Sequence, residues 1–346
     1  MDKTVYINGK FLSQKMSGVQ RYASEICRQL DSNVTIVAAG DQQNSEVYKL
    51  EKPLNLLGSK AGIPWEQIQL PLRLQKAGNP LLINLCNVAP IYYHNKITCL
   101  HDIAFERYPQ YFSRKLTLYY HWLIPRVLKS SRHIITVSEF SKREIAEFYH
   151  IDPKHITVVP NASTFKASPL VLTEPARHRP YFLFVGSLDP RKNLISLLKA
   201  FNSAQLKDID LVVVGAGHAS FATSTEIDAF RQHDNIVFTG YISDEELQNY
   251  YAGALALINP SFYEGFGLPI AEALSMGCPV LASAIDAFKE VGGTAIEYFN
   301  PADVSGLTDL IKNFSAKVPF ERTTGTENRT WKKSAEIVDK IIQQFN

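Results

Sequence analysis

The sequence predicts an α/β fold with two doubly wound domains in tandem. The chain has 346 residues, too many for one ordinary core when a domain takes about 100–200 residues. Short apolar runs alternate with amphipathic helical patterns, which is typical of βαβ units and parallel sheets. A stretch at 164–180 carries Pro169, Pro175 and Pro180 among small and charged residues, and it indicates a linker.

Each predicted strand is a short apolar run, and each predicted helix repeats its apolar residues every three or four positions. In the first half we expect strands at 4–7, 34–38, 81–85, 97–100 and 133–137, with helices at 19–30, 64–75, 114–129 and 141–149. In the second half we expect strands at 181–185, 211–214, 235–238, 254–258 and 279–282, with helices at 193–202, 244–251, 269–275 and 305–313. The expected organisation is an N-terminal domain at 1–165, a linker at 166–180, a C-terminal domain at 181–328 and a last helical segment at 329–346.

Composition and charge exclude several classes of protein. The formal net charge is +2, with 45% hydrophobic and 20% charged residues, so no basic field for a nucleic acid is expected. The N-terminal MDKTVYINGKFLSQ has no apolar region typical of a signal peptide, and no run approaches the roughly 18 apolar residues of a membrane span. We expect a reduced, cytoplasmic chain without disulfides or structural zinc, because the four cysteines are far apart in sequence: Cys27, Cys86, Cys99 and Cys278.

The segment richest in functional signals is NPSFYEGFGLPIAEALSMG, at 259–277, after a predicted strand. Gly265 and Gly267 allow backbone amides to approach a ligand, and Pro269 suits the start of a helix whose N-terminus attracts phosphate. Glu264 before this helix and Glu272 in its expected first turn suit the hydroxyl groups of a sugar. The alternative is that Glu272 only complements the helix dipole and Glu264 is solvated.

A second segment, FVGSLDPRKNL at 184–194, places two cations where a strand ends and a helix begins. Arg191 and Lys192 oppose the helix dipole there, which makes sense if an anion such as a diphosphate binds to them. A solvated basic pair is the alternative.

Two further positions lie at strand ends or helix starts in the first domain. His101 follows a predicted strand and could bind a substrate hydroxyl or phosphate, with Asp102 fixing its tautomer, or it could be a structural histidine. Gly18 opens the first helix, as a ligand-binding loop or as a simple turn.

Two patterns with known chemistry are not expected to act here. Residues 215–220, GAGHAS, nearly match the dinucleotide fingerprint, but Ser220 replaces the third glycine, so a nicotinamide dehydrogenase is disfavoured. Asp208 and Asp210 form a DxD pattern before a predicted strand, at the wrong end of the sheet, so we interpret it as a loop and expect no metal.

No acidic residue occurs between Glu106 and Glu139. The stretch at 107–132 instead interleaves cations with aromatic residues, a combination that suits an anionic membrane surface or a lipid-pyrophosphate acceptor. An ordinary helix with one wet and one packed face is the alternative. The residues concerned are Arg107, Arg114, Lys115, Arg126, Lys129 and Arg132, with Tyr108, Tyr111, Phe112, Tyr119, Tyr120 and Trp122.

These motifs together resemble the retaining glycosyltransferases of family 4. The matching pieces are SGVQRYASEICRQL, HDIAFERYPQYF, TVSEFSKREI, VVPNA, FLFVGSLDPRKNL, VVVGAG, VFTGYISDEEL, the Glu264–Glu272 pattern, similar to the family's E-x7-E, and TWKKSAEIVDKII. The resemblance runs nearly end to end and implies the GT-B fold, two facing Rossmann-like domains with an interdomain cleft. It also implies that the last helix crosses back to the first domain.

The resemblance assigns roles to particular residues. Arg191 and Lys192 would bind the donor diphosphate, Glu264 the transferred sugar and Glu272 the ribose. Backbone groups would complete the site, at the base from Gly240, Tyr241 and Ile242, and around the sugar and diphosphate from Gly265, Phe266, Gly267 and Leu268. His101 would lie near the donor sugar, and Gly18 in a loop facing diphosphate and acceptor. No metal or cofactor is implied, because the Arg/Lys pair and the helix dipole offset the leaving group's charge.

Within the family, GVQRYASEI, WEQIQLPL and HDIAFERYPQYF look most like bacterial mannosyltransferases that build O-antigen and other surface polysaccharides. This implies GDP-mannose as the donor and a lipid-linked saccharide as the acceptor, at the inner face of the plasma membrane. UDP-glucose, UDP-N-acetylglucosamine, dTDP-rhamnose and GDP-fucose stay open as donors. A nucleotide-sugar 2-epimerase and a non-catalytic saccharide-binding subunit are the remaining alternatives.

Overall fold

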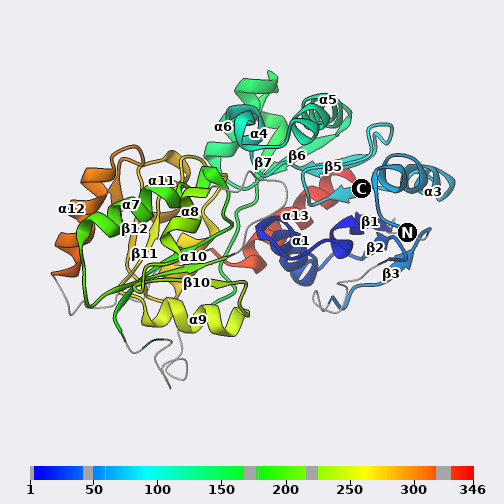
Figure 1. Ribbon diagram of the computed structural model, residues 1–346. Coiled ribbons are helices and arrows are strands. Elements are labelled where there is room, and N and C mark those ends of the chain that lie inside the picture. The colour runs from blue at the N-terminus through cyan, green and yellow to red at the C-terminus, as the bar shows by residue number, and fades with distance from the viewer. Residues whose placement is uncertain are drawn as a thin grey trace. The chain divides into compact units, whose positions relative to one another are not determined.

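The computed structural model describes residues 4–41, 50–58, 60–166, 177, 179–215, 225–316 and 329–346 (Figure 1). The chain divides into two compact units. The first comprises Met1–Ile103, Leu118–Ala162 and Arg329–Asn346, and the second comprises Ala104–Thr117 and Ser163–Asn328. The sequence did not predict that the segment Ala104–Thr117 groups with the second unit. Most of the expected linker at 166–180 lies outside the described residues.

The first unit contains a parallel sheet of seven strands in the order β3-β2-β1-β4-β5-β6-β7. The strands are β1 (Val5–Asn8), β2 (Val34–Ala38), β3 (Leu54–Leu56), β4 (Leu82–Asn84), β5 (Lys96–Cys99), β6 (His133–Thr136) and β7 (Ile156–Val158). Its helices are α1 (Gly18–Gln29), α3 (Leu70–Lys76), α6 (Glu139–Tyr149), α13 (Trp331–Phe345) and most of α5 (Arg114–Ser130), with short turns η1 (Gly9–Ser13), η2 (Trp65–Gln69) and η4 (Pro153–His155). The order reverses between β1 and β4, because the chain adds β2 and β3 on one side and later strands on the other.

The second unit contains a parallel sheet of six strands in the order β10-β9-β8-β11-β12-β13. The strands are β8 (Tyr181–Val185), β9 (Asp210–Val214), β10 (Ile236–Gly240), β11 (Ala256–Asn259), β12 (Val280–Ser283) and β13 (Glu297–Phe299). Its helices are α7 (Leu194–Ala204), α8 (Thr225–Phe230), α9 (Asp244–Gly253), α10 (Leu268–Ser275), α11 (Asp286–Gly292) and α12 (Val304–Ser315), with α4 (Ala104–Arg107), η3 (Pro109–Tyr111) and η6 (Pro190–Lys192). The strand order here reverses between β8 and β11.

Helices cover both faces of the second sheet, as a doubly wound fold requires. Successive side chains of a strand point to opposite faces. Phe182 packs in a core cluster with residues of α7 and α12. Its neighbour Tyr181 faces the other way, toward α9, where its hydroxyl donates to the Tyr250 carbonyl oxygen at 2.8 Å. The prediction of doubly wound parallel sheets is therefore confirmed.

The last helix, α13, packs on α1 within the first unit (Figure 1). Thr330 caps its start by accepting from the backbone N–H of Lys333, and the buried Trp331 meets Tyr22 edge-on with ring centroids 5.9 Å apart. Further along, the Asp339 carboxylate accepts from the backbone N–H groups of Asp31 and Ser32, each at 3.0 Å. The helix is thus held by apolar packing and by hydrogen bonds to the turn after α1.

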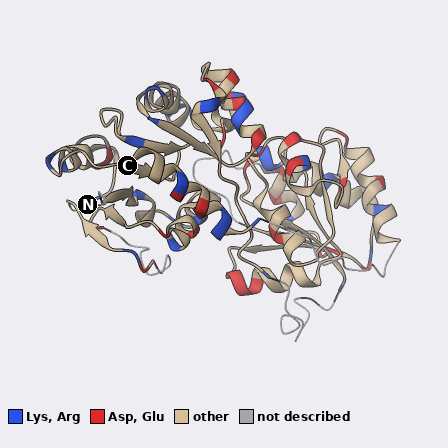
Figure 2. Cartoon of the chain, turned by 180° about the vertical axis from the view of Figure 1, so that it is seen from behind, with Lys and Arg blue, Asp and Glu red and all other residues tan. Residues whose placement is uncertain are grey.

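Acidic and basic residues are interspersed over both units (Figure 2), in keeping with the net charge of +2. Among the described residues, no helix is long and apolar enough to cross a membrane. None of the four cysteines, all within the described residues, forms a disulfide.

Lys96, at the start of β5, is fully buried, which makes the stability of the fold depend on pH. Its Nζ donates to the Tyr93 carbonyl oxygen at 2.7 Å and to the Ser130 hydroxyl at 2.6 Å, two uncharged partners. Burial lowers the pKa of Lys96 to about 7. Between pH 7 and the ordinary lysine pKa, the unfolded chain therefore binds a proton that the folded chain does not.

We expect the free energy of unfolding of the wild type to rise with pH over this window, relative to that of a Lys96→Met variant. The difference should grow by up to about 1.4 kcal/mol per pH unit. Denaturant unfolding of both proteins at pH 6.5, 7.5, 8.5 and 9.5 measures it, and the other titrating groups cancel in the comparison. Parallel pH profiles would contradict the expectation.

Candidate donor-binding site

In open α/β sheets, ligands bind beyond the carboxyl ends of the strands, at the point where the strand order reverses. In the second unit this point lies between β8 and β11. The loop after β8 carries Arg191 and Lys192, and the loop after β11 carries Glu264. The backbone N–H of Phe262 donates to the carbonyl oxygen of Arg191 at 2.8 Å, so the two loops are joined directly.

Arg191 is held in place by a buried acid that the sequence analysis did not single out. Asp189 precedes the short turn η6 and accepts from the backbone N–H of Arg191 at 2.9 Å. Its second oxygen accepts from the Arg191 side chain, from Nε at 2.9 Å and from Nη2 at 2.5 Å. The guanidinium also lies 5.1 Å from the ring centroid of Phe112, in the segment that joins this unit. These contacts fix the guanidinium at the strand ends.

Lys192 and Glu264 form an ion pair across the reversal point. The Nζ of Lys192 donates to Oε1 of Glu264, and Ser261 Oγ donates to the same oxygen at 3.1 Å. Both charged side chains keep some exposure, 16% for Lys192 and 13% for Glu264. The Arg191 side chain is 13% exposed, so the two cations, Arg191 and Lys192, are neither freely solvated nor fully buried.

Asn193 ends the turn η6 and connects it to the loops after β11 and β13. Its backbone is left-handed, with φ of 55°, and its Nδ2 donates to the carbonyl oxygens of Pro260 at 3.1 Å and Pro301 at 2.9 Å. This bridging role followed from no local sequence signal.

Helix α10 begins at Leu268, after a glycine that no other residue could replace without strain. Gly267 has φ of +102°, and a Cβ there would lie 2.8 Å from the ring of Phe288. Gly265 and Phe266 are buried before it, and Pro269 stands at the helix start as expected. The N-terminus of α10 therefore opens directly after Glu264.

Glu272 lies in the second turn of α10, and not in the first as predicted, because the helix begins one residue earlier than expected. It is buried, with 4% of its surface exposed, and its Oε2 accepts from the Tyr251 hydroxyl at 2.9 Å. A buried carboxylate requires hydrogen-bond donors, so Glu272 is more than a solvated complement to the helix dipole.

Gly240, Tyr241 and Ile242 follow from the edge strand β10. Gly240 ends that strand with φ of +73°, and its carbonyl oxygen accepts from the N–H of Gly215 at 2.9 Å. Tyr241 is 75% exposed. The side chain of Tyr241 is thus available to a ligand at this edge.

The structure explains residues of the two patterns that are not expected to act, GAGHAS at 215–220 and the DxD pattern of Asp208 and Asp210. Gly215 has φ of +133°, and a Cβ there would lie 1.9 Å from the carbonyl oxygen of Gly186, so close strand packing requires this glycine. Residues 216–220 lie outside the described part of the chain. The sequence predicts a loop at Asp210, and this prediction is wrong, because Asp210 is the first residue of β9. It is fully buried and forms ion pairs with Arg177 at 2.7 Å and Arg179 at 3.3 Å. In the described ranges no group of three or more His, Cys, Asp or Glu could hold a metal ion.

His101 lies just beyond β5 in the first unit and is buried. Its Nε2 is 3.0 Å from the carbonyl oxygen of Leu85, which can only accept, so Nε2 carries the proton. Burial lowers the pKa of His101, against smaller opposing effects of that hydrogen bond and of Asp102. The neutral ring therefore offers Nδ1 as an acceptor. The tautomer is fixed by Leu85, and not by Asp102 as predicted.

Gly18 is the first residue of α1, and a Cβ at this position would meet no atom within 4 Å. Its position at the helix start is as predicted, and its side of the helix is open.

The second unit thus gathers a fixed guanidinium, a Lys–Glu pair and a helix N-terminus at one reversal point. Cations and a helix N-terminus suit an anionic diphosphate, and carboxylates accept hydrogen bonds from hydroxyl groups. The arrangement can bind a molecule that carries both.

Two family models match consecutive parts of the chain. The model described as glycosyltransferase family 4 matches residues 16–162, and the model described as glycosyl transferases group 1 matches residues 173–317.

Two curated relatives are O-antigen chain mannosyltransferases. RfbU of Salmonella typhimurium is 32% identical over 242 residues, 69% of this chain and 66% of that protein. O-antigen chain mannosyltransferase B of Escherichia coli is 30% identical over 224 residues, 61% of this chain and 59% of that protein. The matches thus span about three fifths to two thirds of the relatives' own length.

Among solved structures, sucrose-phosphate synthase from Thermosynechococcus elongatus is similar, with a TM-score of 0.73 and 20% identity over 99% of this chain and 98% of that one. This likeness concerns the fold alone. With the two parallel sheets described above, it confirms the fold class of two Rossmann-like α/β domains, GT-B.

Proposed function

Because the chain belongs to the glycosyltransferases of family 4 and group 1, we propose that it transfers a mannosyl group from GDP-mannose to a saccharide acceptor. The observation that carries the proposal is the set of Arg191, Lys192 and Glu264 at the reversal point of the second unit. The choice of mannose is supported by the two similar O-antigen mannosyltransferases. The product would extend a bacterial surface polysaccharide.

In this proposal the cations bind the donor diphosphate, with Arg191 held rigidly by Asp189. Glu264 contacts the transferred sugar, and Glu272 accepts from the ribose hydroxyls. Backbone groups of Gly240, Tyr241 and Ile242 contact the base, and those of Gly265 to Leu268 contact the sugar and diphosphate. His101 offers its neutral Nδ1 to a donor hydroxyl, and Gly18 lies in a ligand-facing loop.

The proposed step follows the same-face mechanism of retaining enzymes. The bond from the anomeric carbon to the diphosphate oxygen breaks, and a bond to the acceptor oxygen forms on the same face of the sugar. The acceptor hydroxyl proton passes to the departing diphosphate oxygen. Positive charge at the anomeric carbon is stabilised by the carboxylate of Glu264, and negative charge on the diphosphate by Arg191, Lys192 and the α10 N-terminus, without a metal ion.

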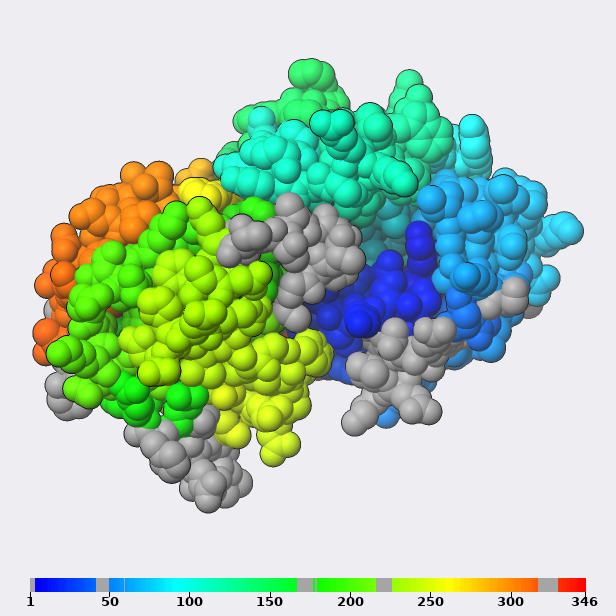
Figure 3. Space-filling model, in the orientation of Figure 1, coloured from blue at the N-terminus to red at the C-terminus, as the bar shows by residue number. Residues whose placement is uncertain are grey.

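The acceptor in this proposal is lipid-linked, and helix α5 supplies the contact with an anionic membrane at the cytoplasmic face. Leu118 and Trp122, one helical turn apart, are 70% and 50% exposed. Arg126 covers the Trp122 ring, with Cζ 4.8 Å from its centroid, and Lys129 follows in the last turn. Exposed apolar residues beside cations favour an anionic lipid surface. This part of the chain forms the teal surface at the top of Figure 3.

Thermal unfolding with a panel of ligands tests the proposed donor. A ligand at 100 times its dissociation constant adds about 2.7 kcal/mol to stability, which is visible as a shift of the melting temperature. We expect GDP and GDP-mannose to raise the melting temperature, and guanosine, UDP, dTDP and NAD to raise it little. Guanosine is the matched control, because it lacks only the diphosphate that Arg191 and Lys192 would bind.

Each other outcome changes a defined part of the proposal. A shift with UDP or dTDP alone would keep a sugar transferase and discard GDP-mannose. Equal shifts with guanosine and GDP would remove the diphosphate role of the basic pair. Donor turnover to an isomeric nucleotide sugar without any acceptor would indicate an epimerase, and binding without turnover a saccharide-binding subunit. Transfer in excess EDTA tests the expected independence from metal ions.

A further inference from the structure

The first unit has its own reversal point, between β1 and β4, and polar side chains end both strands. Asn8 is the last residue of β1 and Asn84 the last residue of β4. Both are buried, at 5% and 1% exposure, and Asn8 Nδ2 donates to Asn84 Oδ1 at 2.9 Å. Ligands bind at such points in open α/β sheets. The donor site proposed above is centred on the reversal point of the other unit and includes only His101 and Gly18 from this one.

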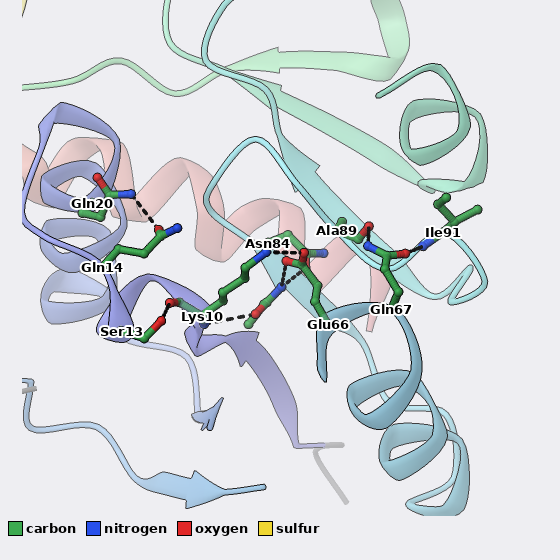
Figure 4. Close-up of polar contacts among 10 residues, drawn as sticks. Lys10, Ser13, Gln14, Gln20, Glu66, Gln67, Asn84, Ala89 and Ile91 are labelled. Carbon is green, nitrogen blue, oxygen red and sulfur yellow. Dashed lines mark hydrogen bonds and ion pairs between the residues drawn. The ribbon is translucent and has the colours of Figure 1, made fainter. Parts of the chain in front are cut away.

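An ion pair completes this cluster, which we call the edge cluster: Asn8, Lys10, Glu66 and Asn84. Figure 4 shows Lys10, Glu66 and Asn84 side by side. Glu66 Oε1 accepts from Asn8 Nδ2 at 3.1 Å, and Glu66 Oε2 accepts from Lys10 Nζ at 2.7 Å. The side chain of Glu66 is 1% exposed and that of Lys10 is 18% exposed. Lys10 is therefore the most accessible side chain of the cluster, and the buried side chains of Glu66 and Asn8 keep it in position.

The turn that carries Glu66 is itself fixed. Glu66 lies in η2, a π-helical turn, a rare conformation that occurs frequently at functional sites. The neighbouring Gln67 donates to the Ala89 carbonyl oxygen and accepts from the Ile91 N–H, each at 3.0 Å (Figure 4). Burying the Glu66 carboxylate costs solvation free energy, and apolar residues of similar size would often be at least as stable. Stability alone therefore does not explain an ion pair at this edge.

We propose that the edge cluster binds hydroxyl groups of the acceptor sugar, with Lys10 as the contacting residue and Glu66 and Asn8 as positioning residues. The inference rests on the proposed transferase function and specifies its acceptor site. One ammonium, one carboxylate and two amides sum to zero charge, which suits a neutral polyhydroxy compound and does not suit a phosphate. The Lys10 ammonium keeps protons beyond the one donated to Glu66, and a sugar oxygen can accept one of them.

Transfer from the donor identified above to simple glycosides tests this site. The acceptors are the methyl α-glycosides of mannose, galactose, glucose and N-acetylglucosamine, and the glycoside that speeds donor consumption most is used for kinetics. In Lys10→Met we expect the KM for that glycoside to rise about 10- to 100-fold, the loss for a hydrogen bond from a charged donor. Hydrolysis of the donor by water and the melting shift with GDP should stay within about twofold, since neither uses the acceptor site.

Three further variants separate binding from structure. Lys10→Arg keeps a cationic donor and should recover most of the acceptor affinity. Glu66→Gln should raise the acceptor KM like Lys10→Met, and if it does not fold, the Lys10 series decides. Lys52→Met is the matched control: Lys52 lies at the opposite, amino-terminal edge of the same sheet and donates to the Leu30 carbonyl oxygen at 2.5 Å. It should leave acceptor kinetics unchanged.

The outcomes distinguish this inference from the function on which it rests. An unchanged acceptor KM in Lys10→Met, with normal GDP binding, would overturn the acceptor site and leave the transferase intact. Donor consumption that none of the four glycosides speeds would also overturn it. Absence of any nucleotide shift in the wild type would instead refute the proposed function itself.

Discussion

Glu264→Gln is expected to lower kcat by about 10²- to 10³-fold while leaving nucleotide affinity nearly unchanged. The variant keeps the shape of the side chain and an oxygen that can accept from Ser261 and Lys192, so the loop after β11 should stay in place. What it removes is the negative charge proposed to stabilise the anomeric carbon as the leaving group departs. An interaction made mainly in the transition state affects kcat more than binding. Steady-state transfer kinetics and the melting shift with GDP measure the two effects.

The surface pair Lys199–Glu226, in the same unit, provides the matched control. Glu226 Oε2 lies 3.5 Å from Lys199 Nζ, and the Glu226 side chain is 57% exposed. Glu226→Gln therefore also removes the carboxylate of a Lys–Glu pair, but at the surface. This variant should transfer sugar at the wild-type rate. Wild-type turnover in Glu264→Gln would contradict the assignment of the site, whatever the control shows.

The strands that the sequence did not predict all lie at sheet edges. β3 and β7 flank the first sheet and β13 ends the second. All three are only three residues long, and each contains one polar residue: Asn55 in β3, Thr157 in β7 and Glu297 in β13. An edge strand has one neighbour and less burial, and all three residues of β3 are exposed. The ten predicted strands, which include the edge strand β10, are apolar runs that periodicity identifies.

The candidate donor residues could be predicted because each lies within a few residues of an apolar strand. Arg191, Lys192 and Glu264 needed only the rule that ligands bind at carboxyl ends. The sequence did not reveal which charges pair. Lys192 and Glu264 are 72 residues apart, and only the strand order brings their loops together. The partner of Arg191 could have been predicted. Asp189 stands two residues earlier, and an Asp just before a helical turn commonly caps it.

No sequence motif predicts the edge cluster, because its residues are far apart in the sequence and only the strand order brings them together. Lys10 and Glu66 are separated by 56 residues, and Asn8 and Asn84 by 76. A usable signal was nonetheless present, because the apolar runs VYIN and LIN both end in asparagine. An amide at the carboxyl end of an apolar strand must find hydrogen bonds where the sheet ends, which marks the ligand edge.

The two reversal points share a chemical pattern. In each unit a lysine in the loop after the strand at the reversal point pairs with a glutamate from another segment: Lys10 with Glu66, and Lys192 with Glu264. The difference is in what surrounds the pair. A second cation, Arg191, and a helix N-terminus accompany Lys192, whereas two neutral amides accompany Lys10. This difference supports an anionic ligand for the second unit and a neutral one for the first.

Glu272→Gln is expected to weaken GDP binding by about 10- to 100-fold, because hydrogen bonds to a charged acceptor contribute about 1.5–3 kcal/mol. The buried carboxylate is held by the Tyr251 hydroxyl and proposed to accept from the ribose. A sharper readout is the preference for GDP over 2′-deoxy-GDP, measured by calorimetric titration. The wild type should prefer GDP, and the variant should lose that preference.

Tyr251→Phe separates ribose binding from a structural role of Glu272. It removes the hydroxyl that donates to Glu272 and keeps the carboxylate, so GDP affinity should fall by only about 2- to 10-fold and the preference for GDP over its 2′-deoxy form should survive. Equal losses for both nucleotides in Glu272→Gln would mean that the carboxylate only supports α10. The preference therefore decides whether the acid contacts the ribose or merely stabilises the helix that does.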